Sequence, residues 1–460
     1  MRGHDDGLCT QSQAKCLGVP TRSADCADVR RGPTLHLRSL RHLRIASAWH
    51  SETRKTAKMR AQSRIGNRKN LIVLSFTLVV VMLGFGMVIP IFPFFVDRLG
   101  AGGSALGLLV ATGALTQLLF GPLWGSISDR TGRKPILMVG MVGYGLSMTL
   151  FGLSTELWML FASQALSGVL ASATMVSAMA YIGDSTGERD RAGGMGALGA
   201  ASGLGIILGP GLGGWLAGDS LSTPFFIAAG LSLLSLLFIQ LLLPETLPPD
   251  ERVTQGRIGL VDFGELWGAL RSPISGLLLL VFIGTIGTSN FEAIFSLYAL
   301  DVLGYGPERV GAILTVVGVV SLIGRGLLTG LATSRWGEPA VIRVGLLAGG
   351  VTFLLLLLAE SLVAVLLTTG LFVLITAFFR PAVHSLTSRR ATVGQGAAMG
   401  LSNSFVSLGR VVGPLWAGAI YDLNPSYPYL SGSVILFATF LLSLLWMKAG
   451  KEGDTPAIGP

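Results

Sequence analysis

The stretch GALGAASGLGIILGPGLGG, residues 196–214, sets glycines four positions apart in an apolar run that carries no charge. A helix with this spacing has one smooth side, along which another helix can approach closely, as is typical of membrane helices. A proline within the run removes one backbone hydrogen bond and permits a bend. The stretch therefore predicts a tightly packed membrane helix. The residues that carry the pattern are Gly196, Gly205, Gly209, Pro210, Gly213 and Gly214.

The same pattern returns 204 positions later in a second apolar run. Its members are Gly400, Gly409, Gly413, Pro414 and Gly418. Composition alone does not produce so regular a spacing, even in a chain with 63 glycines. The sequence therefore predicts a protein with two related halves.

The composition of the whole chain is that of a protein with many membrane spans. Of its 460 residues, 51% are hydrophobic and 13% are charged, and the mean hydropathy is +0.65, far from the values of soluble proteins. A helix crosses the hydrocarbon core in about 20 apolar residues. Runs of that length predict twelve spans, near residues 71–96, 105–125, 135–153, 157–182, 194–217, 223–243, 274–300, 309–330, 340–359, 362–386, 398–420 and 427–447.

These spans divide the chain into bundles, a linker and tails. We expect an all-α membrane protein with two pseudo-symmetric six-helix bundles, residues 71–243 and 274–447. A polar linker, residues 244–273, joins them, and residues 448–460 form a C-terminal tail. Within the linker, the run VDFGELWGALR can lie on the membrane surface through its apolar side chains. Nothing in the sequence suggests a separate soluble domain.

Lys and Arg in the connections predict the orientation, because positive loops favour the cytoplasm. One set of alternate loops holds only Arg98 and Arg309. The opposite set, with the C-terminus, holds fourteen basic residues, which places both termini in the cytoplasm. These residues are Arg130, Arg133, Lys134, Arg189, Arg191, Arg252, Arg257, Arg271, Arg335, Arg343, Arg389, Arg390, Lys448 and Lys451.

The N-terminal tail, residues 1–70, differs from the rest and is expected to be disordered. It holds 15 of the 34 Lys and Arg residues and 5 of the 25 Asp and Glu residues. Its cysteines, Cys9, Cys16 and Cys26, have no metal-ligand spacing, so we expect free thiols and no metal site. Alternating Leu and Arg near residues 35–45 fit a basic surface helix or a targeting presequence. Alternatively, residues 1–58 are an extension upstream of a start at Met59.

A charged loop follows the second predicted span, with the sequence GSISDRTGRKP at residues 125–135. Glycines allow tight turning at a membrane face, and an acid among cations can form ion pairs that break in another conformation. This loop resembles the inter-helix signature of the major facilitator superfamily, and GLATSRWG at residues 330–337 is its weaker copy. The resemblance implies a latch that shuts the cytoplasmic side, with Ser334 in place of the acid in the second copy. The residues that we assign to this gate are Gly125, Asp129, Arg130, Gly132, Arg133 and Arg335.

The glycine pattern at residues 196–214 in turn resembles the fifth-helix signature of drug/proton antiporters of that superfamily. The alternative interpretation is a static packing seam. Its GPGLGG segment also fits a dinucleotide fingerprint, but no strand precedes it and it lies within a membrane span. The chain has no P-loop motif either. We therefore expect no cofactor.

Charges inside membrane spans are costly and are candidates for function. Glu292 lies amid apolar and aromatic residues of the seventh span, where it can serve proton coupling or structural pairing. Arg325 lies toward the cytoplasmic end of its span and can extend its charge to the interface. Arg380 and Arg410 lie deeper and need partners.

The segments around these charges resemble bacterial quinolone and multidrug efflux pumps of the superfamily, over residues 71–447. The resemblance implies that Glu292 lies in a drug-facing cavity, with Arg380 as the helix-10 arginine. It also offers cavity walls at Phe291, Phe295, Phe378 and Phe379.

The chain also departs from that pattern. Ala377 stands where relatives often have an acid, Gln164 where they often have an arginine, and Arg410 where they often have a neutral polar residue. The first span, unlike many, carries no charge. Proton coupling would therefore rest on Glu292.

The sequence as a whole predicts a plasma-membrane exporter of amphipathic or cationic compounds, acting by proton antiport and alternating access. We expect a monomer in the bilayer that handles a small-molecule substrate and protons and binds no nucleic acid. One alternative keeps the fold but exports a specific sugar, metabolite or siderophore. Another is a membrane enzyme or receptor, but a lone His384 supplies no catalytic set.

Overall fold

The computed structural model describes residues 69–185, 188–218, 220–252, 263–391 and 394–446. The chain divides into a unit of residues 1–65 and a unit of residues 66–460, and every described residue belongs to the second unit. The expected tail helix, the three cysteines, the possible start at Met59 and the C-terminal tail lie outside the described residues.

The described residues form helices and connections only, and eleven of their helical runs are long and apolar enough to cross a membrane. Their ends lie within a few residues of the predicted spans, apart from extensions into the charged loops. The helices of residues 69–242, here called the N-bundle, are Lys69–Arg98, α3 (Gly103–Thr131), α4 (Arg133–Gly152), α5 (Leu157–Leu166) continued by η1 (Ser167–Ala171) and α6 (Ser172–Ser185), α7 (Glu188–Ala217) and α8 (Thr223–Leu242).

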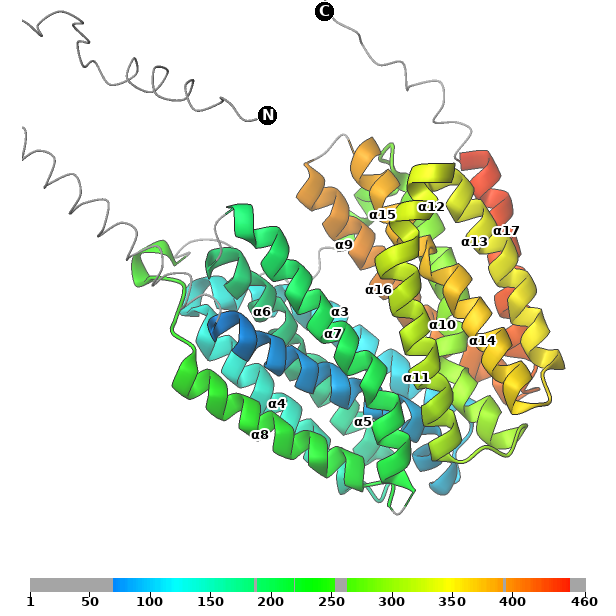
Figure 1. Ribbon diagram of the computed structural model, residues 1–460, viewed down its shortest axis with the longest axis horizontal. Helices are drawn as coiled ribbons and strands as arrows, with labels where there is room; N and C mark the ends of the chain where they lie inside the picture. Colours follow the sequence, from blue (N-terminus) through cyan, green and yellow to red (C-terminus); the bar gives the residue numbers. More distant parts are fainter. Residues whose placement is uncertain (1–68, 186–187, 219, 253–262, 392–393, 447–460) are drawn as a thin grey trace, which may run out of the picture. The chain divides into compact units, whose positions relative to one another are not determined.

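The helices of residues 275–446, here called the C-bundle, repeat this series (Figure 1). The linker between the bundles contributes η2 (Pro249–Glu251) and the short α9 (Phe263–Ala269), whose Trp267 is exposed. The C-bundle consists of α10 (Ser275–Asp301), α11 (Pro307–Ile323) continued by η3 (Gly324–Leu328) and α12 (Thr329–Trp336), α13 (Glu338–Leu355) with η4 (Leu356–Leu358), α14 (Leu362–Ala377), α15 (Phe379–Arg390), α16 (Gln395–Tyr421) and α17 (Tyr427–Trp446).

The twelfth predicted span is α16, which is less apolar than the other eleven. It contains Gln395, Asn403 and Arg410 among glycines and serines. It packs along α10 and α3, and its crossing of the membrane stays a prediction. Gln395 and Asn403 are exposed on this helix, and Arg410 is partly buried.

Glycines let α7 pack tightly against the first helix. An added Cβ would lie 2.5 Å from the Leu83 carbonyl oxygen at Gly209 and 2.6 Å from the Met87 carbonyl oxygen at Gly213. In the C-bundle, an added Cβ at Gly409 would lie 2.8 Å from the Cβ of Thr285 on α10. The close packing predicted from the repeated glycine pattern is thus confirmed in both bundles.

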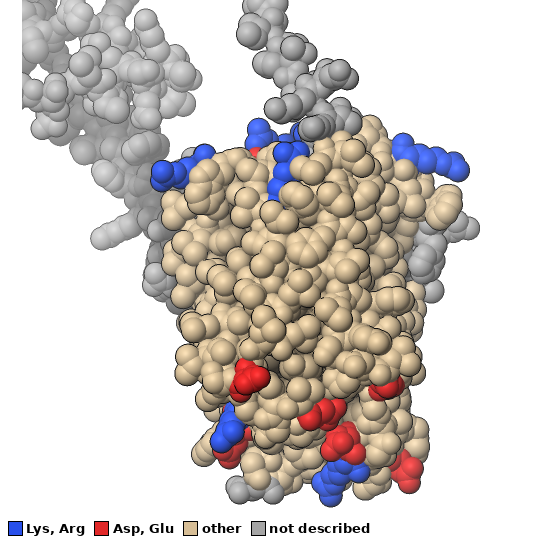
Figure 2. All heavy atoms as spheres, turned by 90° about the vertical axis from the view of Figure 1, so that its right-hand side faces the viewer, with Lys and Arg blue, Asp and Glu red and all other residues tan. Residues whose placement is uncertain are grey.

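Charged residues gather at the two ends of the helices, with an uncharged band between them on the face shown in Figure 2. We call the end at which α3 leads into α4 the basic end, and the end at which α10 leads into α11 the acidic end. The basic end includes Arg130, Arg133, Lys134, Arg271, Arg335 and Arg389. The acidic end includes Asp97, Glu156, Asp301, Glu308, Glu360 and Asp422, with Arg98 and Arg309.

Candidate functional site

Glu292 is exposed on α10, whose neighbouring residues are almost all buried. On one face of the helix, Ser289 approaches α16, because an added Cβ at Gly413 would lie 2.7 Å from its Cβ. On another face, the Phe291 ring lies 5.1 Å from that of Phe372 on α14. At about 100° per residue, Glu292 falls between these two faces. The carboxylate is therefore directed to the space between α14 and α16.

Three arginines from other helices share this region. Arg325 comes from η3, Arg380 from α15 and Arg410 from α16, and the charges of Glu292, Arg325 and Arg410 all act on Arg380. Among the described residues, no ion pair includes Glu292. Nη2 of Arg380 is buried and has no hydrogen-bond acceptor among these residues. The site thus combines one carboxylate with three cations and keeps donors available.

Breaks in helix geometry position two of these arginines. Arg325 lies in the π-helical turn η3, where the hydroxyl of Thr329 donates a 2.9 Å hydrogen bond to the Gly324 carbonyl. Arg380 follows the break between α14 and α15, where Pro381 lacks the N–H that would continue the helix. Irregular turns of this kind are frequent at functional sites.

The predicted aromatic walls mostly lie inside the C-bundle in this conformation. Phe291, Phe295 and Phe379 are all at most 3% exposed. The Phe291 ring lies 4.9 Å from the Phe295 ring, tilted by 31°, and Phe379 fills the space beside Gly284 on α10. Only Phe378 is partly exposed. Their role as substrate walls stays a prediction.

The departures from the family pattern have a packing counterpart. Ala377 is buried and packs against η3. An added Cβ at Gly324 of η3 would lie 3.0 Å from the Cβ of Ala377. A carboxylate at residue 377 would have to enter this contact. The small side chain therefore allows the helices of Arg325 and Arg380 to approach closely.

The two bundles meet at the acidic end through two matching contacts. The Gly214 backbone of α7 packs on that of Gly311 of α11, and Gly418 of α16 packs on Gly107 of α3, the corresponding residues 204 positions away. The carboxylate of Asp422 accepts N–H groups of Gly103 at 2.6 Å and Ser104 at 3.0 Å, so it caps α3 from the opposite bundle.

Sequence reasoning did not identify Asp422. The sequence feature that could have pointed to it is the start of α3, where Gly102 has no side chain to cap the helix. A helix whose first N–H groups have no local acceptor needs one from elsewhere.

Toward the basic end the bundles separate. An added Cβ at Gly318 of α11 would lie 3.1 Å from Cα of Ile207 on α7, and one at Gly203 of α7 would lie 3.5 Å from Cδ1 of Leu322. Further along α7, an added Cβ at Gly199 or Gly196 would meet nothing within 4 Å. Gly326 and Gly330 on the facing helix are equally open, as is Gly400 on α16. The conformation is therefore closed at the acidic end and open at the basic end.

The predicted gate residues lie at the open end, and Arg133 forms its ion pairs within the N-bundle. Arg133 Nε donates to Asp184 at 2.8 Å, and its Nη1 donates to Asp129 at 2.5 Å. Glu245, beyond α8, accepts the backbone N–H of Arg133 at 2.9 Å. Gly125 lies against Val176 of α6, and Arg335 is exposed. Asp184 and Glu245 were not among the predicted gate residues.

Comparison with known proteins shows the family to which the chain belongs. A family model described as Major Facilitator Superfamily matches residues 74–391 and 277–458. Multidrug resistance protein 2 of Bacillus subtilis is 31% identical over 389 residues, which cover 84% of this chain and 97% of the relative. The quinolone resistance protein NorA of Staphylococcus aureus is 29% identical over 388 residues, covering 82% and 96%.

Solved structures share the fold. A bacterial homologue of the human lysosomal transporter Spinster has a TM-score of 0.65 at 16% identity, covering 83% of this chain and 95% of that chain. A human organic anion transporter has a TM-score of 0.60 at 23% identity, covering 82% and 99%.

Proposed function

The chain belongs to the major facilitator superfamily, and from that premise we propose that it exports amphipathic small molecules, drugs among them, across the plasma membrane in exchange for protons. Relatives of about 30% identity over most of the chain are named for multidrug and quinolone resistance. Because the chain belongs to a transporter family, the alternative of a membrane enzyme is set aside. We expect the unit of transport to be a monomer.

The observation that carries the proposal is the position of Glu292. Among the described residues, it is the one carboxylate that lies away from both ends of its membrane helix. It is exposed between α14 and α16, in a conformation that is open at the basic end. An ionisable side chain at such a depth is a candidate for proton transfer.

The orientation follows from the charges. We assign the basic end to the cytoplasm, because Lys and Arg favour that side. The present conformation would then admit a compound from the cytoplasm or the inner leaflet. Both termini would be cytoplasmic, and the site would lie between the two bundles.

In the proposed cycle, a cationic or amphipathic compound binds while the carboxylate of Glu292 is ionised. The contacts at Gly107 and Gly214 then open and the basic end closes, as alternating access requires. A proton from the outside binds Glu292 and removes its negative charge, so the attraction for a positive group is lost and the compound leaves. The protonated carrier returns and releases the proton inside.

The arginines favour a second candidate within the same fold. Arg325, Arg380 and Arg410 outnumber the single carboxylate, and Nη2 of Arg380 has no acceptor among the described residues. Guanidinium groups bind carboxylates and phosphates well. If the substrate is instead one specific metabolite or siderophore, an acidic one fits this site better than a neutral sugar.

The experiment is the accumulation of ethidium and of a fluoroquinolone in an efflux-deficient bacterium that makes the chain, with and without a protonophore. We expect reduced accumulation that the protonophore restores. Glu292→Gln should remove at least most of this effect, because the side chain keeps its size but cannot ionise. The matched control is Glu360→Gln, since Glu360 is an exposed acid at the acidic end.

Two results would contradict the proposal. One is unchanged export of both compounds by Glu292→Gln, which would exclude Glu292 as the coupling group. The other is no export by the unaltered chain, shown to be present in the membrane, which would favour the acidic-metabolite exporter.

A further inference from the structure

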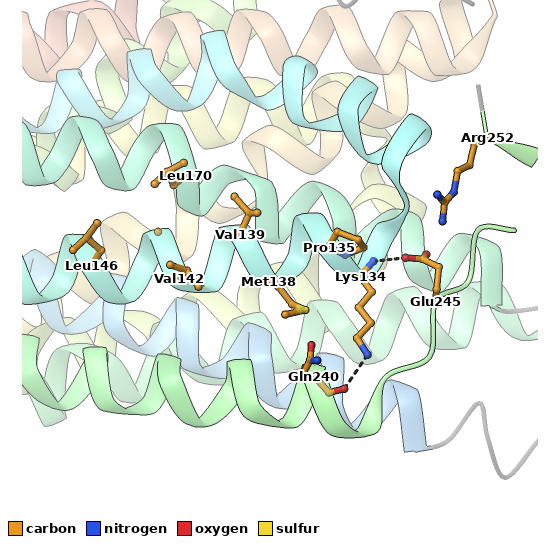
Figure 3. A pocket seen from close by; sticks show the side chains of 11 residues that line it. Lys134, Pro135, Met138, Val139, Val142, Leu146, Leu170, Gln240, Glu245 and Arg252 are labelled. Carbon is orange, nitrogen blue, oxygen red and sulfur yellow. Dashed lines mark hydrogen bonds between the residues drawn. The ribbon is translucent and has the colours of Figure 1, made fainter. Parts of the chain in front are cut away.

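A groove opens on the outer surface of the N-bundle, at its basic end. It lies between α4, η1 and the end of α8, and it has a volume of about 750 Å³. Figure 3 shows an apolar stretch along α4 that ends near Lys134, Glu245 and Arg252. None of the residues assigned above to the substrate site lines this groove. The groove is therefore separate from the proposed substrate site.

The apolar stretch follows one face of α4 for about three turns. From Lys134 to Leu146 the helix rises about 18 Å, which is close to one leaflet of a hydrocarbon core of about 30 Å. At Gly143, an added Cβ would lie 2.7 Å from Cδ1 of Leu170, so the glycine lets η1 close the side of the groove. The apolar lining is made by Pro135, Met138, Val139, Val142, Leu146 and Leu170.

Two cations lie where the apolar stretch ends. Nζ of Lys134 donates one hydrogen bond, 2.9 Å long, to the Gln240 carbonyl, and an ammonium group has three donors. Nε of Arg252 is buried and has no acceptor among the described residues. Within that part of the chain, no ion pair includes either side chain. Both cations therefore keep donors for an anion.

Among the described residues that line the groove, Glu245 is the one carboxylate, and it is already engaged. Glu245 accepts the backbone N–H groups of Arg133 at 2.9 Å and Lys134 at 3.2 Å, as well as those of Thr246 and Leu247. It therefore serves as a cap for α4. Beyond Gln240, a second recess of about 410 Å³ shares Lys134 and adds Lys69. The charged residues that line the two recesses are thus three cations and one carboxylate.

We propose that this groove binds an anionic phospholipid of the leaflet at the basic end. One acyl chain lies along α4, and the phosphate lies between Lys134 and Arg252. The apolar length selects a lipid over a free phosphate, and the cations select an anionic headgroup over a zwitterionic one. Basic pockets between membrane helices are suited to such headgroups.

The bound headgroup would join two parts of the chain that lie far apart in sequence. Lys134 belongs to the start of α4, next to Arg133 of the gate, and Arg252 belongs to the linker after α8. A phosphate between them holds the linker against the N-bundle. This inference does not depend on which compound the chain exports.

The test uses the full-length chain, purified in detergent and equilibrated with equal amounts of phosphatidylglycerol and phosphatidylcholine that have the same acyl chains. Native mass spectrometry then measures which lipid stays bound. We expect phosphatidylglycerol to be retained in preference. Arg252→Gln should reduce the preference about tenfold, because a charge-assisted hydrogen bond is lost. Arg271→Gln, which removes an exposed linker arginine outside the groove, should leave it unchanged.

A second variant tests the apolar part without changing a charge. Val142 is 51% exposed in the groove, so Val142→Trp fills it from the surface and should lower the retention of both lipids. The control is Val344→Trp on α13, at a site that is 64% exposed. Equal retention of the two lipids by the unaltered chain would overturn the proposal. So would equal losses in test and control variants, or displacement of phosphatidylglycerol by inorganic phosphate.

Discussion

The loop between α3 and α4 and the loop between α12 and α13 are equivalent parts of the two bundles. Each forms an ion pair, but the basic and acidic residues occupy exchanged positions in the two loops. In the first, Arg133 pairs with Asp184 at 2.8 Å. In the second, 205 positions later, Glu338 pairs with Arg389 at 3.0 Å. The geometry of the repeat is thus kept while the charges are exchanged. A pair of this kind can be conserved in space without being recognisable in the sequence.

The two loops also differ in the exposure of the arginine and in the number of carboxylates that it binds. Arg133 has a side chain that is 10% exposed and binds Asp129 as well as Asp184. The second loop has Ser334 at the position of Asp129, and its hydroxyl donates to its own helix, at the Leu331 carbonyl. Arg389 is 70% exposed. The N-bundle loop thus has a buried arginine with two carboxylate partners, whereas the C-bundle loop has an exposed arginine paired with Glu338, which also accepts from the Ser385 hydroxyl at 3.1 Å.

Replacing the glycine of each loop by alanine should give the largest difference in lost stability between the two loops. Gly132 and Gly337 have φ values of 112° and 75° with extended ψ, a region that is nearly restricted to glycine. Gly337→Ala should cost about 2 kcal/mol for this strain. Gly132→Ala should cost about 2 kcal/mol more, because its Cβ would lie 2.5 Å from the capping carboxylate of Glu245. Thermal unfolding in detergent measures both. Equal losses would show that the cap contributes nothing.

Removing the arginine of each ion pair should give the next largest difference in lost stability between the two loops. Arg133→Ala leaves Asp129 and Asp184 without their partner and should lower stability by about 2 kcal/mol. Arg389→Ala breaks a surface pair and should cost about 0.5 kcal/mol. The midpoint of thermal unfolding is again the measurement. A larger effect at Arg389 than at Arg133 would contradict the distinction between the buried and the exposed arginine.

Making the first loop resemble the second should have the smallest effect on stability. Asp129 is 48% exposed, so Asp129→Ser should cost about 0.5 kcal/mol. Its effect on export should be larger, if Asp129 forms a latch in the state that closes the basic end. Efflux of ethidium from cells separates the two readouts, with Ser334→Asp as the reciprocal change. Normal export by Asp129→Ser would remove this residue from the gate.

Much of the candidate site could be predicted from local sequence. Glu292, Arg325, Arg380 and Arg410 are conspicuous because charges are rare in apolar runs. Whether a side chain faces the space between bundles or the core of its own bundle cannot be read in the same way. Phe291 and Glu292 are adjacent, yet the ring is 3% exposed and the carboxylate is exposed. Neighbouring helices decide this, because they cover one side of α10 and leave another uncovered.

The sequence by itself determined the all-helical membrane fold, its two halves and the glycine packing of α7 and α16. These follow from apolarity and from small residues at helical spacing, which are properties of a single segment. Only the tertiary structure decided that Asp422 caps α3, that Arg133 and Glu338 hold equivalent places, and that Arg252 and Lys134 line one groove. Each of these depends on side chains from distant segments that meet only when the helices pack, so no local pattern records them.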